Sequence, residues 1–199
     1  MEVQRDNPLI VQSDRSILLE TDGSRFEDAR DAIAPFAELI KSPEHIHTYR
    51  VTPLSLWNAA AAGMSAEEMI AQLKEYSKYE VPENILFEIR DTVSRYGRLK
   101  VYKREDGMLV LESDDALLVT QLKRQKTLQP YVQGVEDGRR VIVKPIERGN
   151  LKCALIKLGF PVEDLAGYVQ GAPLEFELRD EALSGREFSL RKYQVEAVD

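Results

Sequence analysis

The residues Thr52 to Glu112 decide the fold, with the sequence TPLSLWNAAAAGMSAEEMIAQLKEYSKYEVPENILFEIRDTVSRYGRLKVYKREDGMLVLE. Three helical segments follow one another in this stretch. The first begins at Thr52-Pro53, a cap residue with proline at the first helical position, and ends at Gly63. Ser65-Ala66-Glu67-Glu68 is a capping box that opens the second helix, and Val81-Pro82-Glu83 begins the third.

Two strands follow these helices. Leu99–Tyr102 and Met108–Leu111 flank Glu105-Asp106-Gly107, an Asp-Gly signal for a tight hairpin. Three helices and a hairpin follow the order of a winged-helix domain, so the sequence predicts a winged-helix-like core over residues 53–113. In such domains the third helix can lie in the major groove of DNA.

The residues before this core predict a hairpin, a helix and a strand. Pro8–Thr21 (PLIVQSDRSILLET) has two apolar runs around a polar turn. Phe26, Ala29, Ile33 and Ala37 then recur at helical spacing, and we expect that helix to continue to Ser42-Pro43. His45–Val51 alternates as a strand does. With a further helix over 115–129, these elements give an amino-terminal accessory domain over residues 1–133.

A smaller module is predicted after a boundary at Gly134–Gly138, a polar stretch bounded by glycines. Arg139–Val143 is predicted as a strand, Glu147–Leu158 as a helix and Leu174–Leu178 as a strand, which gives a mixed α/β module over 139–185. The predicted fold class is therefore α+β, with an amino-terminal hairpin and helical domain followed by this module.

Composition indicates a folded protein with an uneven charge distribution. Of 199 residues, 43% are hydrophobic and 31% are charged, and the formal net charge is −7. Residues 98–157 nevertheless contain 13 Lys and Arg against 8 Asp and Glu, so the rest of the chain has a net charge of −12. The middle of the sequence is therefore basic, and charge acts locally.

Several classes of site are excluded by residue usage. Cys153 is the only cysteine, so an internal disulfide and a cysteine-based zinc cluster are excluded. His45 and His47 lie two apart, but without a third ligand we interpret them as structural and expect no metal site. Without a secretion signal or a membrane-spanning apolar stretch, we expect a cytoplasmic protein that binds no membrane.

Two basic clusters are the candidate DNA contacts. Lysines and arginines can bind phosphates wherever several gather, whereas the third helix carries three acids against two bases and could equally dock a protein. The cluster on the small module comprises Arg139, Arg140, Lys144, Arg148 and Lys152, and the cluster on the hairpin comprises Arg98, Lys100, Lys103 and Arg104.

The sequence holds no complete nucleotide-hydrolysing site. Asp180-Glu181-Ala182-Leu183 resembles an acidic magnesium box, but no Gly-x-x-x-x-Gly-Lys-Ser/Thr precedes it, so we reject this assignment. No catalytic residue is therefore proposed. We expect this chain by itself neither to hydrolyse ATP nor to unwind DNA.

The end of the sequence resembles a helicase motif. Leu190-Arg191-Lys192-Tyr193-Gln194 is similar to the adenine-sensing Q motif of superfamily-two helicases. Upstream, Pro8–Thr21, His45–Trp57 (HIHTYRVTPLSLW), Tyr76–Pro82 (YSKYEVP) and Arg95–Lys100 (RYGRLK) resemble the amino-terminal region of the XPB family of DNA repair helicases, and Val141–Leu178 resembles its damage-recognition domain.

This resemblance implies a role within a larger enzyme. It makes residues 186–199 the start of the first motor lobe, with Gln194 and Arg191 as adenine contacts. ATP and magnesium are implied for the intact helicase, with no cofactor held by this chain. The implied partners are forked, damaged or unwinding DNA, the motor lobes and a nuclease, in a bacterial- or archaeal-type protein. A protein-interaction scaffold that does not bind DNA remains the alternative.

Overall fold

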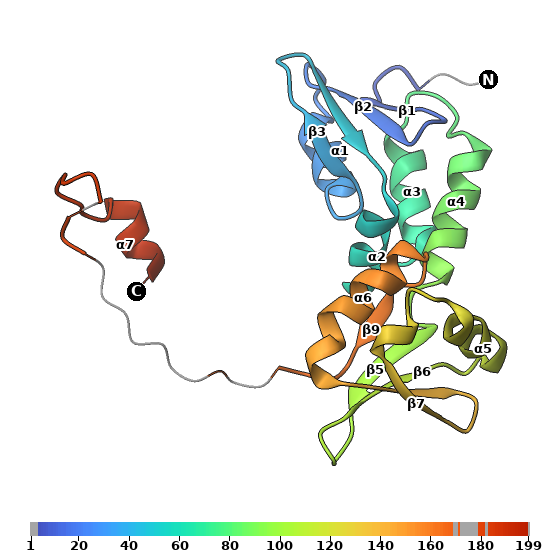
Figure 1. Cartoon of the computed structure of the whole chain (residues 1–199). Helices are drawn as coiled ribbons and strands as arrows, with labels where there is room; N and C mark the ends of the chain where they lie inside the picture. Colours follow the sequence, from blue (N-terminus) through green and yellow to red (C-terminus); the bar gives the residue numbers. More distant parts are fainter. Residues whose placement is uncertain (1–3, 169–170, 172–178, 182, 199) are drawn as a thin grey trace. The chain divides into compact units, whose positions relative to one another are not determined.

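The computed structural model describes residues 4–168, 171, 179–181 and 183–198. It divides into two compact units, Met1–Gly167 and Tyr168–Asp199. The first unit contains two β-sheets, each with helices and a hydrophobic core of its own (Figure 1). The fold class is α+β, as the sequence predicted.

The first sheet has the strand order β1-β2-β4-β3. The hairpin predicted at residues 8–21 is confirmed as β1 (Leu9–Val11) and β2 (Ser16–Glu20). β4 (Ile46–Arg50) pairs antiparallel with β2, and β3 (Glu38–Lys41) forms the outer edge beside β4.

Four helices complete this half, and two of them begin at the cap residues that the sequence indicates. They are α1 (Phe26–Ile33), α2 (Pro53–Ala61), α3 (Ala66–Tyr76) and α4 (Glu83–Ser94). The Thr52 and Ser65 side chains each accept a hydrogen bond from the backbone N–H three residues on. α1 and α3 pack on the sheet, while α4 packs on α2 and α3.

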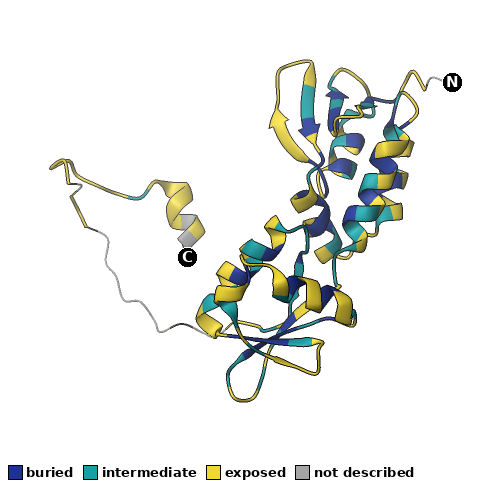
Figure 2. Cartoon of the chain, turned by 45° about the vertical axis from the view of Figure 1, so that its right-hand side comes forward, coloured by how far each residue is buried: buried dark blue, intermediate teal, exposed yellow. Residues whose placement is uncertain are grey.

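β3 is where the prediction of a long first helix is wrong. The helix ends at Ile33, and Phe36 and Ala37 turn into the core with exposed fractions of 0% and 6%. The chain then pairs with β4 as an edge strand whose four residues are all exposed (Figure 2). The apolar spacing that suggested a continuous helix instead comes from two separate segments, α1 and the turn at Phe36 and Ala37, whose apolar side chains are buried in the same core.

The second sheet has the strand order β7-β8-β6-β5-β9. Its strands are β5 (Leu99–Lys103), β6 (Leu109–Glu112), β7 (Val132–Glu136), β8 (Arg140–Val143) and β9 (Val162–Asp164). All neighbours are antiparallel except β5 and β9, which run parallel. We call residues 98–167 the sheet module.

One face of this sheet is covered by α5 (Ala116–Arg124) and α6 (Arg148–Lys157). Alternate strand residues point to the same face, and the apolar ones on this face share a core with Leu122 of α5 and Leu155 of α6. Short 3₁₀ turns, Gln129–Tyr131 and Pro145–Glu147, precede β7 and α6. The other face, which we call uncovered because neither α5 nor α6 packs on it, carries Lys100, Tyr102, Glu112 and Arg140 around the buried Val110 and Ile142.

The arrangement differs from the predicted organisation in two places. The hairpin β5–β6, expected as the wing on α2–α4, pairs with β8 and β9 and shares their core, so the winged-helix description of residues 53–113 is not confirmed. Gly134–Gly138, where we expected a boundary, holds the end of β7 and its turn into β8. Asp137 and Gly138 both have positive φ, 49° and 67°, as a tight hairpin turn requires.

The second unit is small in its described part. Glu181 and Glu187 form an isolated antiparallel bridge, and α7 spans Lys192–Val198. The strand expected at 174–178 lies outside the described residues.

Candidate nucleic-acid interface

A row of alternating charges crosses the uncovered face of the sheet module. The strand register places Glu163, Lys100, Glu112, Arg140 and Glu136 side by side across all five strands. Lys100 Nζ lies 3.7 Å from a Glu163 carboxylate oxygen, and Arg140 Nε donates to Glu112 at 2.8 Å. Three carboxylates therefore match two cations, and this row has no surplus positive charge to attract phosphates.

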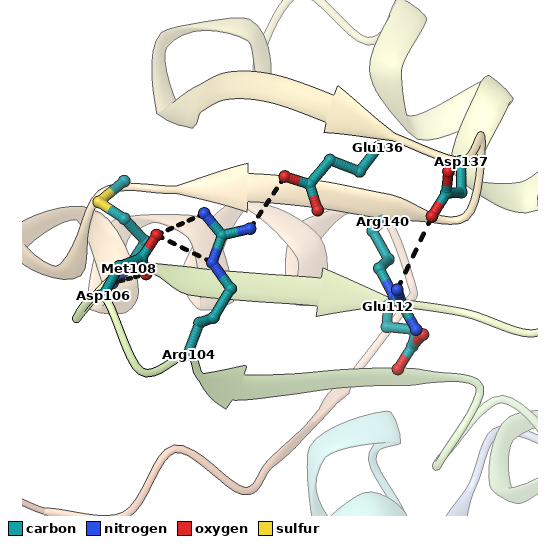
Figure 3. Close-up of polar contacts among 7 residues, drawn as sticks. All are labelled: Arg104, Asp106, Met108, Glu112, Glu136, Asp137 and Arg140. Atoms are coloured by element: carbon teal, nitrogen blue, oxygen red, sulfur yellow. Dashed lines mark hydrogen bonds and ion pairs between the residues drawn. The ribbon is translucent and has the colours of Figure 1, made fainter.

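Arg104 ties the β5–β6 hairpin to β7 on the same face. Its Nη1 donates to Glu136 at 2.9 Å and its Nε to Asp106 at 2.9 Å (Figure 3). The hydrogen bond from Arg104 and the one from the Met108 N–H lower the pKa of Asp106. Figure 3 also shows Arg140 between Glu112 and Asp137. Arg140 Nη1 lies 3.8 Å from a carboxylate oxygen of Asp137.

The carboxylate of Asp164, in β9, binds the side chains of two residues that were predicted to contact DNA. Its carboxylate accepts hydrogen bonds from Arg148 Nε at 2.9 Å, Arg148 Nη2 at 2.6 Å and Lys152 Nζ at 2.7 Å. Burial raises the pKa of Asp164, but the hydrogen bonds from Arg148 and Lys152 outweigh it and the net pKa lies below its ordinary value. The acid fixes α6 to the sheet edge, a role that the sequence did not indicate because β9 was not predicted.

The structure separates the nine predicted cations by face and by pairing. Arg140 lies on the uncovered face, whereas Arg148 and Lys152 extend from α6 on the covered face. Six have carboxylate partners: Arg98, Lys100, Arg104, Arg140, Arg148 and Lys152. The other three, Lys103, Arg139 and Lys144, are exposed and have no ion pair within the described part of the chain.

Arg98 lies beside the start of α5 rather than on an open wing. It pairs at 2.8 Å with Asp115, whose carboxylate caps α5 through the Leu117 and Leu118 N–H groups. These backbone hydrogen bonds, more than Arg98, lower the pKa of Asp115. The pair thus joins the entry of β5 to α5.

The side chains of His45 and His47 each lie beside another side chain of the first half of the chain. The His47 ring meets Phe26 edge-on with centroids 5.4 Å apart, and His45 Nδ1 lies 3.5 Å from an Asp22 oxygen. Among the described residues no group of three His, Cys, Asp or Glu side chains could hold a metal ion.

The residues of the Q-like motif lie at the start of α7. Gln194 Oε1 accepts a hydrogen bond from the Arg191 N–H at 3.0 Å, which caps the helix. The Gln194 amide group therefore already has a local structural partner.

Within the described residues, no helix is long and apolar enough to span a membrane.

Comparison with known proteins assigns the chain to a family. A family model described as "Helicase conserved C-terminal domain" matches residues 9–135. Two proteins named DNA 3'-5' helicase XPB, from Kineococcus radiotolerans and Mycobacterium tuberculosis, are 48% and 47% identical to it over 194 residues. Each match covers 98% of this chain and 34% of the relative, so the chain spans about a third of their length.

A eukaryotic relative is more distant. The Saccharomyces cerevisiae protein named "General transcription and DNA repair factor IIH helicase/translocase subunit XPB/SSL2" is 31% identical over 197 residues, which are 95% of this chain and 23% of that protein. The match to the helicase model and the collinear similarity to bacterial and yeast proteins agree with one another. This chain belongs to the XPB family of superfamily-two DNA helicases.

Proposed function

We propose that this chain is the DNA-engaging and regulatory portion of an ATP-dependent XPB-type helicase that acts in DNA repair. The observation that carries the proposal is the 48% identity, over 98% of the chain, to a protein named DNA 3'-5' helicase XPB. The yeast relative's name supports the repair role, since it includes the words "DNA repair factor".

The sheet module is the part that we propose to engage DNA. Lys103 ends β5 and Lys144 directly follows β8, and the register places both at the same end of the sheet. Arg139 lies at the other end, before β8. An unpaired lysine or arginine can bind a phosphate without first leaving a carboxylate, so these three contribute more to affinity than their six paired neighbours.

Gln194 and Arg191 are proposed to contact adenine in the intact helicase. A glutamine amide has one donor and one acceptor group, which match the edge of adenine. The Oε1 atom already accepts from the Arg191 N–H, and a carbonyl oxygen has a second lone pair for the ligand. ATP and magnesium would then be held with motor residues that this sequence does not include.

Titration of a labelled DNA fork with the 199-residue chain tests the proposal. At about 50 mM salt we expect binding that weakens steeply as salt rises, because phosphate contacts release counterions. Replacing Lys103, Arg139 and Lys144 with glutamine should lower both the affinity and its salt dependence. Absence of measurable affinity for fork, single strand and duplex at low salt would overturn DNA engagement.

A protein-docking scaffold is the second candidate, and β3 favours it. This edge strand leaves Leu39 53% and Ile40 48% exposed, and Ile46, at the start of the neighbouring strand β4, is 43% exposed. An exposed apolar edge can accept a strand from another protein. A partner such as a nuclease should then bind a chain that has no DNA affinity at low salt, and should bind the Ile40→Lys variant more weakly. Unchanged partner affinity in that variant would reject this role for β3.

A further inference from the structure

We infer that the hollowed surface between the carboxyl-terminal ends of α5 and α6, the α5–α6 groove, binds a single strand of nucleic acid. Two hollows of about 420 Å³ each meet at Leu158. Thr127, Asn150, Cys153 and Lys157 line one of them, and Gln121, Arg124, Gln125 and Phe160 line the other. Volumes of this size are typical of sites that hold small ligand groups.

Arg124 and Lys157 line this groove, and Lys123 and Lys126 lie next to its α5 residues in the sequence. Lys123 and Arg124 lie in the last turn of α5, Lys157 lies in the last turn of α6, and Lys126 follows α5. Within the described chain none of the four has an ion-pair or hydrogen-bond partner for its side chain, and no carboxylate lines either hollow. This contrasts with the row on the opposite face of the sheet, where carboxylates outnumber the cations.

Neutralising helix ends does not account for so many charges. The carboxyl-terminal end of a helix carries roughly −0.5 charge, so two ends bring about −1 against four cations. A surplus of about three positive charges remains, in a chain whose formal net charge is −7. Such a surplus without carboxylates favours an anionic ligand with several phosphates.

The shape and the other lining groups favour a single strand over a duplex. The surface is concave, whereas reading a duplex groove requires a protruding helix or ribbon. Tyr131 lines the first hollow and Phe160 the second, and both are partly exposed. Aromatic rings beside cations are the elements that bind bases and phosphates of single strands, and the amides of Gln121 and Gln125 can meet base edges.

The inference rests on the proposed function only in its choice of DNA, and one titration separates the two. The probe is a fluorescein-labelled oligothymidine of 20 nucleotides, measured by anisotropy with the 199-residue chain. Four phosphate contacts to a single strand give a log–log salt slope of about −2.8, or about a 50-fold loss of affinity between 50 and 200 mM salt. The Arg124→Gln/Lys157→Gln variant should keep a slope of about −1.4 and bind at least tenfold more weakly at 50 mM.

A matched control removes two other exposed cations. Lys41→Gln/Arg50→Gln in the first sheet changes the net charge equally and should bind like the wild type. If the wild type binds the strand and the groove variant binds it equally well, the inference fails and DNA engagement stands. If the wild type binds neither strand nor duplex, both fail. If polyglutamate of equal charge displaces the labelled strand, the groove binds an acidic peptide as well as it binds nucleic acid. That result would overturn the assignment of a nucleic-acid ligand.

The wild-type chain offers a second measurement that needs no substitution. Cys153 is the only cysteine, is exposed, and lines the first hollow. Saturating oligothymidine should slow its alkylation by iodoacetamide at least several-fold, and raising the salt should restore the rate. An unchanged rate at saturation would place the strand elsewhere.

Discussion

Replacing Asp164 with asparagine should loosen the sheet module while leaving the first half of the chain intact. The carboxylate accepts three hydrogen bonds from Arg148 and Lys152, and its side chain is only 14% exposed. Hydrogen bonds to charged groups contribute about 1.5–3 kcal/mol each, and the amide keeps one acceptor oxygen while water can reach both cations. We therefore expect a loss of about 2–3 kcal/mol.

Hydrogen exchange measured by mass spectrometry can localise this loss. A loss of about 2–3 kcal/mol corresponds to an increase of about 30- to 150-fold in the exchange rate of amides that open with α6 and β9. The Leu165 N–H, which donates to the Val101 carbonyl at 2.8 Å, is one of them. Peptides from β2 and α3 should exchange as in the wild type, because their core is separate.

The control lies one residue away. Glu163→Gln removes a 3.7 Å pair with Lys100, whose side chain is 50% exposed, so its effect should stay within about 1 kcal/mol. Equal effects of Asp164→Asn and Glu163→Gln would refute the argument that burial and the number of hydrogen bonds make Asp164 the important acid.

The stabilisation of the fold by Asp164 should depend on pH in a defined direction. The folded-state pKa of Asp164 is below its ordinary value, so the acid stabilises the fold fully above the ordinary carboxyl pKa. That contribution is lost as the pH falls through the lowered folded-state pKa. The difference between wild type and Asp164→Asn should therefore be constant near neutral pH and vanish on acidification. A difference that grows in acid would contradict the assignment.

Three further outcomes follow from the core, the caps and the sequence. Leu155→Ala, at a position with no exposure, should cost about 2–5 kcal/mol in the sheet module, measured by hydrogen exchange. Ser65→Ala should cost about 1 kcal/mol in thermal unfolding through the lost cap of α3, and Ser65→Thr should restore most of it. The chain should release no phosphate from ATP with magnesium and single-stranded DNA, because its sequence has no phosphate loop; release above a buffer blank would contradict this.

Local signals in the sequence identified most elements correctly but not their partners. The caps at Thr52 and Ser65 predicted α2 and α3 because a cap depends on residues three positions apart. The Asp106-Gly107 signal predicted the β5–β6 hairpin because a tight turn depends on adjacent residues, and Gly107 has the positive φ, 83°, that such a turn requires. The same dipeptide at Asp137-Gly138 was interpreted as a boundary. The antiparallel pairing of β7 with β8 on either side of it shows that it closes a hairpin.

The candidate interface was predictable in residue type but not in arrangement. Lysines and arginines are visible in a sequence, whereas their partners come from distant segments: Asp164 for Lys152, and Glu163 for Lys100. The pairing of β9 with β5 joins residues more than sixty positions apart, and no local pattern encodes it. For this reason the free cations of the α5–α6 groove could not be told from the paired ones before the fold was known.

The parallel pairing of β5 with β9 has a mechanical consequence. The chain enters the second sheet at the first residue of β5 and leaves it at the last residue of β9, and the two strands lie side by side. Tension on the flanking chain pulls these parallel strands along their length in opposite directions. The hydrogen bonds between them are then loaded together in shear, instead of breaking one after another as in a peeled hairpin. This edge of the module should therefore resist a pull along the polypeptide more strongly than a hairpin of equal length would.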